Sequence, residues 1–220
     1  MTPPPAPWQI LVVDDHEAVL HGTVAALQKN YGEADIRTAA TAQAALDLLH
    51  LKLPSLVVLD LSIPQRPGET SLVETGIGLL RSLMQQHPDL NLVVQSAHVK
   101  PLVRLKSMID DHRGGFTIVD KSAPLAEMLV RVDWALQGVN YTPRDMRGGL
   151  EVKPEWLQVL QLAFQQGLQD KAIADQMKVS ERTVRHYWSK VQDVLAVYPD
   201  PGKNIRIQTE IRAREEGLID

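Results

Sequence analysis

Short apolar runs alternate with longer amphipathic segments over the first 137 residues, and this rhythm restricts the fold more than any other feature of the chain. The runs are rich in Val, Ile and Leu, as strands buried on both faces of a parallel sheet should be. The segments between them repeat apolar residues at helical spacing, so helices should connect the strands and cover both faces. We predict five parallel strands, at 9–13, 35–39, 55–59, 90–95 and 116–119, and helices at 18–29, 41–50, 76–86, 101–111 and 124–137.

Composition limits what this chain can be. The 220 residues suffice for two compact domains, and the absence of cysteine excludes disulfides and thiolate metal sites. The apolar runs are far shorter than the roughly 18 residues that cross a bilayer, and residues 1–7 lack the basic start and apolar core of a signal peptide. We therefore expect a flexible leader and a cytoplasmic protein that does not contact membranes. Because the net charge is -4, any DNA binding must depend on a local basic cluster.

A second domain with a different pattern follows the first. Gly and Pro interrupt the polar stretch 138–149, which we interpret as a linker. Beyond it the pattern is helical only, at 154–166, 170–177, 180–195 and 205–216. The expected organisation is a doubly wound α/β domain at 8–137, a linker at 138–149 and a small all-α domain at 150–220.

Polar residues that suit phosphoryl chemistry follow four of the predicted strands. Asp14 and Asp15 come after the first strand, Asp60 after the third, Ser96 after the fourth and Lys121 just beyond the fifth. The carboxyl ends of parallel strands meet at one edge of the sheet, so these side chains should converge. Crowded carboxylates repel unless a cation lies between them, and an oxygen-rich set of this kind suits Mg2+. A lysine and a serine can contact phosphoryl oxygens, so the set favours phosphorylation of a carboxylate.

This set of residues resembles that of response-regulator receiver domains, over roughly residues 8–137. The resemblance implies a flavodoxin-like sheet and an aspartate that accepts a phosphoryl group from a phosphohistidine of a sensor histidine kinase. The residues that carry it are the acidic pair with His16, the segment from Asp60 to Pro64, Ser96 with Ala97, and Lys121.

The resemblance also assigns roles within the site. Asp60 would be the phosphorylated residue. Mg2+ would be held by Asp15, Asp60 and the backbone carbonyl of Ser62, with Asp14 acting through a water molecule. Lys121 would hold the phosphoryl oxygens, together with the hydroxyl that follows the fourth strand.

The sequence departs from the receiver pattern at two places. Receivers commonly carry an aromatic residue three positions before the lysine, which rotates when the switch hydroxyl moves. Here Ile118 stands at that position, so the expected switch consists of Ser96 and an aliphatic side chain. The loop 65–75 is also longer than most strand-to-helix loops. It is either a surface insertion, which costs little stability, or a lid through which Arg66 or Glu69 tunes the lifetime of the phosphoryl group.

The segment 170–190 predicts a helix-turn-helix, with a short helix, a tight turn and a longer helix capped by Ser180. Apolar residues occupy the positions where the two helices pack. The other face of the second helix would enter a major groove, where Arg pairs with guanine. That face carries Arg182, Arg185, His186, Ser189 and Lys190.

The helical domain resembles the LuxR-type DNA-binding domain, through Lys-Ala-Ile-Ala-Asp-Gln-Met at 171–177 and Val-Ser-Glu-Arg-Thr-Val-Arg at 179–185. With a receiver before it, the chain is similar to the NarL/FixJ class of two-component response regulators. The resemblance implies promoter DNA as a partner and a homodimer in the active state. Base edges would face Arg185, His186 and Ser189, and phosphates would be held by Lys171, Arg182, Thr183 and Lys190.

The favoured function is a transcription factor whose DNA binding is controlled by phosphorylation of Asp60. It is not an enzyme beyond the receiver's own phosphorylation and dephosphorylation. Three alternatives stay open at this point. The first domain could be a pseudo-receiver, with DNA binding independent of phosphorylation or with signalling through a protein partner. It could be a phosphohydrolase that uses Asp60 as nucleophile, although such enzymes follow an Asp-x-Asp pattern and Ser62 stands at its second position. The helical domain could bind protein instead of DNA.

Overall fold

The computed structural model describes residues 7–97, 99–142 and 152–220. The chain divides into two compact units, Met1–Val99 with Ser107–Pro143 and Lys100–Lys106 with Arg144–Asp220. Apart from its last residue, the expected leader lies outside the described residues, as does the 143–149 part of the expected linker. Within the described ranges, no helix is both long enough and apolar enough to cross a membrane.

The first unit is built on a parallel sheet with the strand order β2-β1-β3-β4-β5-β6. Every neighbouring pair of strands is parallel. The central strands are buried on both faces, which explains their nearly uniform apolar sequences. The predicted doubly wound parallel fold is therefore confirmed. The strands are β1 (Gln9–Val13), β2 (Asp35–Ala39), β3 (Leu56–Leu59), β4 (Asn91–Gln95), β5 (Phe116–Val119) and β6 (Asn140–Tyr141).

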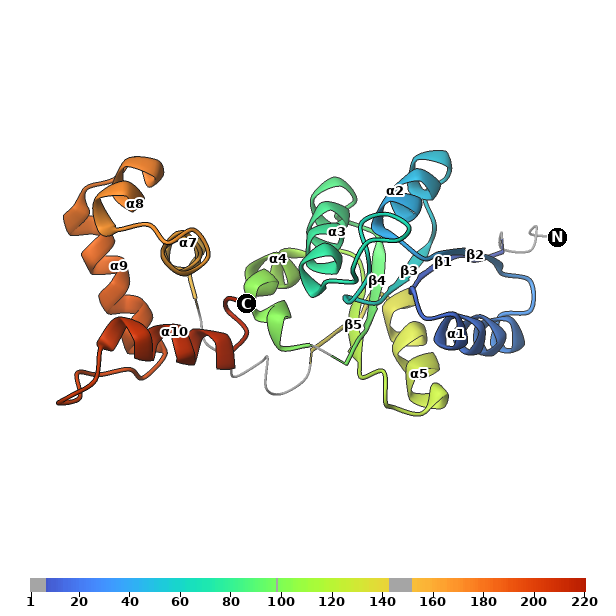
Figure 1. The fold of residues 1–220 in the computed structure, drawn as a ribbon. Coiled ribbons are helices and arrows are strands. Elements are labelled where there is room, and N and C mark those ends of the chain that lie inside the picture. Colours follow the sequence, from blue (N-terminus) through green and yellow to red (C-terminus); the bar gives the residue numbers. More distant parts are fainter. Residues whose placement is uncertain (1–6, 98, 143–151) are drawn as a thin grey trace. The chain divides into compact units, whose positions relative to one another are not determined.

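Helices cover both faces of this sheet. Figure 1 shows α1 and α5 on one side and α2, α3 and α4 on the other. On the first side, Val58 of β3 belongs to the same buried cluster as Leu27 of α1 and Val132 of α5. The helices of this part are α1 (Glu17–Asn30), α2 (Ala42–Leu51), α3 (Val73–Gln86), α4 (Lys106–Asp111) and α5 (Leu125–Leu136).

One predicted helix takes a different form. The segment expected to be a single helix at 101–111 is a 3-10 helix at Lys100–Leu105 followed by α4. Leu102 and Leu105 are both buried. A 3-10 helix has three residues per turn, so two residues that are three apart, such as these leucines, lie on the same side of it. In an α-helix the turn is longer, and the same two side chains would be less well aligned.

The number of strands was also predicted incorrectly, because the sheet has six strands and β6 lies inside the expected linker. After α5, Gly138 adopts a positive φ of 76° that reverses the chain. The Phe116 N–H then donates to Asn140 Oδ1 at 2.9 Å, and Tyr141 packs against Arg131, whose guanidinium lies 3.9 Å from the ring centre. A strand of two residues held by such tertiary contacts has no periodicity from which it could be predicted.

Over residues 152–220 the second unit has helices and no strand, as predicted, and it forms around the buried Trp188 of α9. The indole Nε1 donates to Asp170 Oδ1 of α8 at 3.1 Å. The guanidinium of Arg206 in α10 lies 3.5 Å from the centre of the Trp188 ring and 3.0 Å from both Asp170 oxygens. Phe164 of α7 packs edge-on against the same ring, with 5.5 Å between centroids. One side chain thus joins α7 (Pro154–Phe164), α8 (Asp170–Met177) and α10 (Ile205–Glu215) to α9 (Glu181–Val194).

Gly76→Ala should destabilise the first unit, whereas Gly78→Ala in the same helix should not. A Cβ at position 76 would lie 2.1 Å from the backbone oxygen of Leu61, so either α3 or the chain just after Asp60 would have to move. Position 78 is exposed, and nothing lies within 4 Å of a Cβ added there. Overpacking typically costs about 1–3 kcal/mol, while an exposed Gly→Ala change in a helix gains about 0.5–1 kcal/mol. Urea unfolding measures both effects, and equal stability of the two variants would contradict the packing argument.

Candidate functional site

Three acidic side chains meet where the carboxyl ends of β1 and β3 lie side by side. Asp14 and Asp15 follow β1, and Asp60 follows β3, which pairs with β1. The Asp60 N–H donates to Val13 O at 2.8 Å, which fixes Asp60 beside the acidic pair. Ligand atoms of the three acids and of His16 all lie within 4.8 Å of one another. The structure thus brings together the acidic residues that the strand ends predicted.

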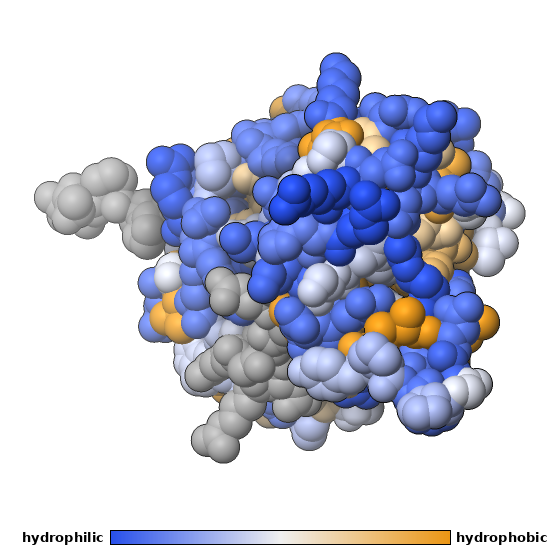
Figure 2. Space-filling view, turned by 90° about the vertical axis from the view of Figure 1, so that its left-hand side faces the viewer, coloured by the Kyte–Doolittle hydropathy of each residue, from blue (hydrophilic) through white to orange (hydrophobic). Residues whose placement is uncertain are grey.

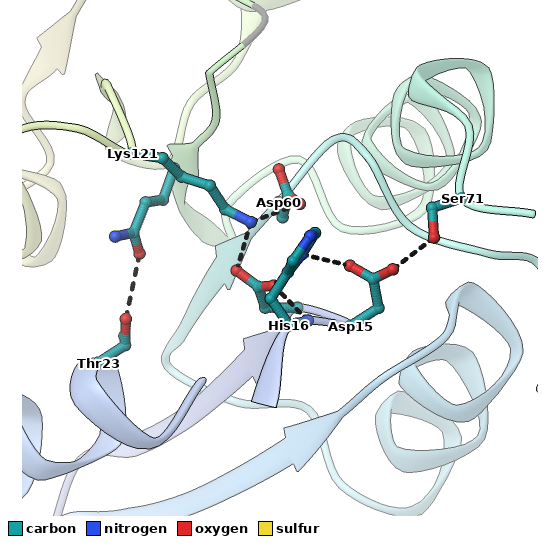
Figure 3. A network of polar contacts seen from close by, with 8 residues as sticks. Asp15, His16, Thr23, Asp60, Ser71 and Lys121 are labelled. Carbon is teal, nitrogen blue, oxygen red and sulfur yellow. Dashed lines mark hydrogen bonds and ion pairs between the residues drawn. The ribbon is translucent and has the colours of Figure 1, made fainter. Parts of the chain in front are cut away.

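Lys121 lies between two of these acids, as Figure 3 shows. Its Nζ is 2.8 Å from Asp14 Oδ2 and 2.7 Å from Asp60 Oδ2. Both carboxylates are buried, with 4% and 2% of their surface exposed. Burial raises the pKa of Asp60 above its ordinary value, although the Lys121 ammonium opposes this shift. Burial by itself lowers the pKa of Lys121, but the bonds and charges of the two carboxylates together raise it. The lysine therefore stays charged at neutral pH.

The remaining oxygens of this cluster fit a divalent cation. Asp60 Oδ1 and Asp15 Oδ1 are buried without a hydrogen-bond partner. His16 Nδ1 lies 2.8 Å from Asp15 Oδ1 without the alignment of a hydrogen bond, and it is 3.2 Å from Asp14 Oδ1. A single ammonium does not balance three carboxylates, and hard oxygen donors of this kind suit Mg2+. Ser62, the expected carbonyl donor, is half-buried two residues beyond Asp60.

The expected switch hydroxyl is fully buried at the end of β4. The Ser96 N–H donates to Val119 O at 3.1 Å, and the Lys121 N–H lies 3.4 Å from Ser96 O. These backbone bonds join the segment that carries the hydroxyl to the segment that carries the lysine. Ile118 is buried within β5, and Phe116 two places earlier is buried as well. The core therefore packs an aliphatic side chain where receivers commonly carry a movable aromatic ring.

The long loop after β3 is folded back and tethered at both ends. Leu72 donates its N–H to Ile63 O at 3.1 Å, and the two residues form an isolated antiparallel bridge. At the other end, the N–H groups of residues 42–43, at the start of α2, donate to the carbonyls of residues 64–65 at 3.0 and 3.1 Å. The bridge lets α3 begin at Val73, three residues earlier than predicted. The loop is consequently shorter and better anchored than the sequence indicated.

A loop residue that the sequence did not single out reaches the acidic cluster. Ser71 Oγ donates a hydrogen bond to Asp15 Oδ2 (Figure 3). Arg66 and Glu69, the residues expected to tune the site, have exposed side chains. His16 was also missed as a member of the cluster, although its place next to the acidic pair was a signal for it. No spacing rule indicated Ser71, because the closure of the loop decides which side chain faces inward.

The segment that contains α8 and α9 has the geometry of a helix-turn-helix. Helix α8 ends at Met177, and Lys178 adopts a left-handed conformation with φ of 55° that turns the chain. Helix α9 then begins after Ser180, whose Oγ accepts a hydrogen bond from the Thr183 N–H at 3.1 Å. This bond satisfies one of the free N–H groups of the first helical turn. The predicted turn and cap are present.

Helix α9 has one buried stripe and one exposed polar stripe. Val184 and Trp188 point into the core. The ion pairs on the other side are long, at 3.7 Å from Arg185 to Glu181 and 3.8 Å from Lys190 to Asp193. The two acidic side chains therefore hold these cations only weakly. In the space-filling view of Figure 2, hydrophilic residues predominate, with smaller hydrophobic patches between them. Among the predicted DNA contacts, Lys171, Arg182, Arg185, His186 and Ser189 are exposed, and Thr183 and Lys190 are half-buried.

Several known proteins are similar to this chain. The transcriptional activator protein ExaE of Pseudomonas putida is 27% identical, and the match covers 86% of this chain and 90% of that protein. The methanol utilization control regulatory protein MoxX of Paracoccus denitrificans is 30% identical over 135 residues, which cover 61% of this chain and 56% of MoxX. Among solved structures, the response regulator RcsB of Salmonella typhimurium matches 91% of this chain and 98% of its own, with a TM-score of 0.58 at 20% identity.

Family models account for both units. Residues 156–198 match the bacterial regulatory proteins of the luxR family. Residues 10–133, more than half of the chain, match the response regulator receiver domain. The acidic cluster lies within the receiver match, and the helix-turn-helix lies within the luxR match. The chain therefore belongs to the response regulators, with a receiver domain followed by a helix-turn-helix domain of the LuxR type.

Proposed function

We propose that Asp60 accepts a phosphoryl group from a phosphohistidine of a sensor histidine kinase, and that this modification controls DNA binding by α8 and α9. The setting of Asp60 carries the proposal. One of its oxygens is held by Lys121, while the other is buried without a hydrogen-bond partner at the edge of the sheet where ligands bind. The names of the relatives ExaE, a transcriptional activator, and MoxX, a control regulator, support a role in transcription.

In the proposed reaction a carboxylate oxygen of Asp60 attacks phosphorus, the bond from phosphorus to the histidine nitrogen breaks, and the imidazole keeps the electron pair. Mg2+, when bound, supplies positive charge that offsets the carboxylates and the phosphoryl oxygens. Asp15, Asp60 and the carbonyl of Ser62 would hold it, with Asp14 acting through water. The Lys121 ammonium turns to a phosphoryl oxygen. The same residues serve small phosphodonors and hydrolysis, so the receiver catalyses its own phosphorylation and dephosphorylation.

The switch is proposed to work through the backbone near β4 and β5. The Ser96 hydroxyl donates to a phosphoryl oxygen and moves with it. Because the Ser96 backbone is bonded to the strand before Lys121, this movement shifts the adjoining loop even though Ile118 provides no aromatic ring. The exposed Arg66 and Glu69 stay candidates for an effect on the lifetime of the phosphoryl group.

For DNA recognition we propose that α9 enters the major groove and that two chains bind together. The net charge of -4 gives no general attraction to DNA, and a dimer doubles the phosphate contacts. A structure of two RcsB dimers bound to two parallel DNAs has a similar fold, with a TM-score of 0.55 at 19% identity. Bases would be contacted by Arg185, His186 and Ser189, and phosphates by Lys171, Arg182, Thr183 and Lys190.

The domain boundaries are proposed as a leader at 1–7, a receiver at 8–137, a linker at 138–149 and a DNA-binding domain at 150–220. The two residues of β6 extend the receiver sheet into the first part of the linker. The cytoplasm is the proposed location, because both promoter DNA and the phosphorylated domain of a sensor kinase are found there.

Acetyl phosphate with Mg2+ should phosphorylate the wild type once and should not phosphorylate Asp60→Asn. The carboxylate is the only group in this proposal that forms the acyl phosphate, and the amide of Asn is not a nucleophile. Intact-mass spectrometry at neutral pH measures the added phosphoryl group. Asp89→Asn, which changes an exposed aspartate of the same unit, is the control and should be labelled like the wild type. Labelling of Asp60→Asn would show that another residue is the acceptor.

Asp60→Asn should also stabilise the first unit at neutral pH when Mg2+ is absent. The pKa of Asp60 is raised by burial, so ionisation is less favourable in the folded protein than in the unfolded chain. This loss is absent at low pH, where the carboxyl is protonated in both states. It grows as pH rises above the ordinary pKa of an unfolded aspartate, and it is complete once pH exceeds the raised pKa of the folded state. The gain from Asn should therefore be present at pH 7 and should shrink towards about pH 4, the ordinary pKa of an aspartate. Calorimetric melting at both pH values checks this, and a less stable variant at pH 7 would contradict it.

Arg185→Ala should weaken binding to a sequence selected from a random DNA library by about 10-fold or more, the range of a lost base contact. Lys190→Ala should weaken binding more evenly across sequences and should reduce the salt dependence by about one phosphate contact. Fluorescence anisotropy at two salt concentrations separates the two effects. Arg113→Ala, which removes an exposed arginine of the receiver, is the control. Failure of the wild type to select any DNA sequence would favour a protein partner for this domain, and unchanged binding by both α9 variants would place the DNA contacts away from α9.

A further inference from the structure

We infer that Ser71 is a positioning residue of the metal site, through which the long loop after β3 sets the Mg2+ affinity of this receiver. The inference rests on the proposed function, because it concerns the cation that the acidic residues would hold. Figure 3 shows the Ser71 hydroxyl pointing at Asp15 from the side of the site opposite Lys121. Its Oγ donates a hydrogen bond to Asp15 Oδ2.

The loop holds this hydroxyl in place through its backbone. Leu72, the next residue, donates its N–H to Ile63 O at 3.1 Å and accepts a hydrogen bond from the Thr75 N–H at the start of α3, also at 3.1 Å. Ile63 is itself completely buried. The start of the loop is held to α2 by two further backbone bonds, at 3.0 and 3.1 Å. Ser71 is therefore presented by an anchored segment whose position does not depend on its own side chain.

Asp15 has more need of such support than the other two acids. Lys121 fixes Asp14 and Asp60 through its ammonium. The Asp15 side chain is 20% exposed, and its Oδ1 has His16 Nδ1 only 2.8 Å away. The same imidazole nitrogen also lies 3.2 Å from Asp14 Oδ1, so it is shared between two acids and does not fix Asp15 alone. The hydrogen bond from Ser71 adds a contact that belongs to Asp15 only.

The two oxygens of Asp15 then have separate tasks. Oδ2 accepts from Ser71, while Oδ1 is buried without an aligned hydrogen bond. Asp15 itself belongs to the acidic cluster that could hold a cation, so Oδ1 is the oxygen left for it. A partner that orients a metal-binding carboxylate keeps the ligand in its binding geometry before the ion arrives. Removing such a partner typically lowers metal affinity by about 10–100-fold. The hydroxyl of Ser71 thus fixes one oxygen of Asp15, as the Lys121 ammonium fixes one oxygen of Asp60, but it adds no charge.

The test measures the affinity of the full chain for Mg2+ by isothermal titration calorimetry with MgCl2, in the absence of any phosphodonor. Ser71→Ala should raise the dissociation constant for Mg2+ by about 10-fold or more. Ser71→Thr keeps the hydroxyl and should bind Mg2+ like the wild type. Thr70→Ala, which changes the exposed neighbour in the same loop, should also leave the affinity unchanged. All variants should melt at the wild-type temperature without Mg2+, and saturating Mg2+ should restore labelling of Ser71→Ala by acetyl phosphate.

Three results would overturn the inference. Wild-type affinity in Ser71→Ala would show that the hydroxyl does not position Asp15. Equal loss of affinity in Ser71→Thr or in Thr70→Ala would assign the effect to the shape of the loop and not to the hydroxyl. Both results leave the proposed function intact, since the wild type still binds Mg2+ and is still labelled at Asp60. Failure of the wild type itself to bind Mg2+ would remove the proposed metal site and the inference with it.

Discussion

Two buried carboxylates share one ammonium at the edge of the receiver sheet, and the other features of the site follow from this contact. Lys121 satisfies one oxygen of Asp14 and one of Asp60. It does not neutralise the cluster, because Asp15 adds a third carboxylate. The excess negative charge favours a cation, and burial raises the pKa of Asp60 although the Lys121 ammonium opposes this shift. In the proposed function, a phosphoryl group and its cation replace this unfavourable charge distribution.

Tight packing beneath the site couples the position of Asp60 to the segments directly beside it. Gly76 brings α3 so close to the backbone of Leu61 that no side chain fits between them. The residue after Asp60 is therefore pressed against the start of a helix, and the same helix begins where the long loop ends. Any displacement of Asp60 must be accommodated by α3, by the loop or by both. Close-packed interiors respond to such displacement by switching between arrangements and not by gradual deformation.

The DNA-binding unit solves a different problem, namely how a small helical domain holds its recognition helix rigidly. Trp188 occupies the centre, and its indole N–H is satisfied by Asp170. Arg206 covers the ring and pairs with the same carboxylate. Arg206 and Asp170 therefore neutralise each other beside the core. The cations on the exposed stripe of α9 are only loosely paired. Rigid support beneath an exposed basic stripe is what a helix that must fit a groove requires.

By itself the sequence determined the parallel α/β class, the helix-turn-helix and the acidic residues of the site. Periodicity shows where strands end, and parallel strands all end at one edge, so Asp14, Asp60 and Lys121 had to meet. Only the tertiary structure decided which loop residue faces this edge and where a sixth strand pairs. Ser71 reaches Asp15, while Arg66 is exposed to solvent. The reason is that a bridge between Ile63 and Leu72 closes the loop, and neither residue belongs to a periodic segment of the sequence. Such closure depends on contacts between distant segments, and no local pattern of residues records them.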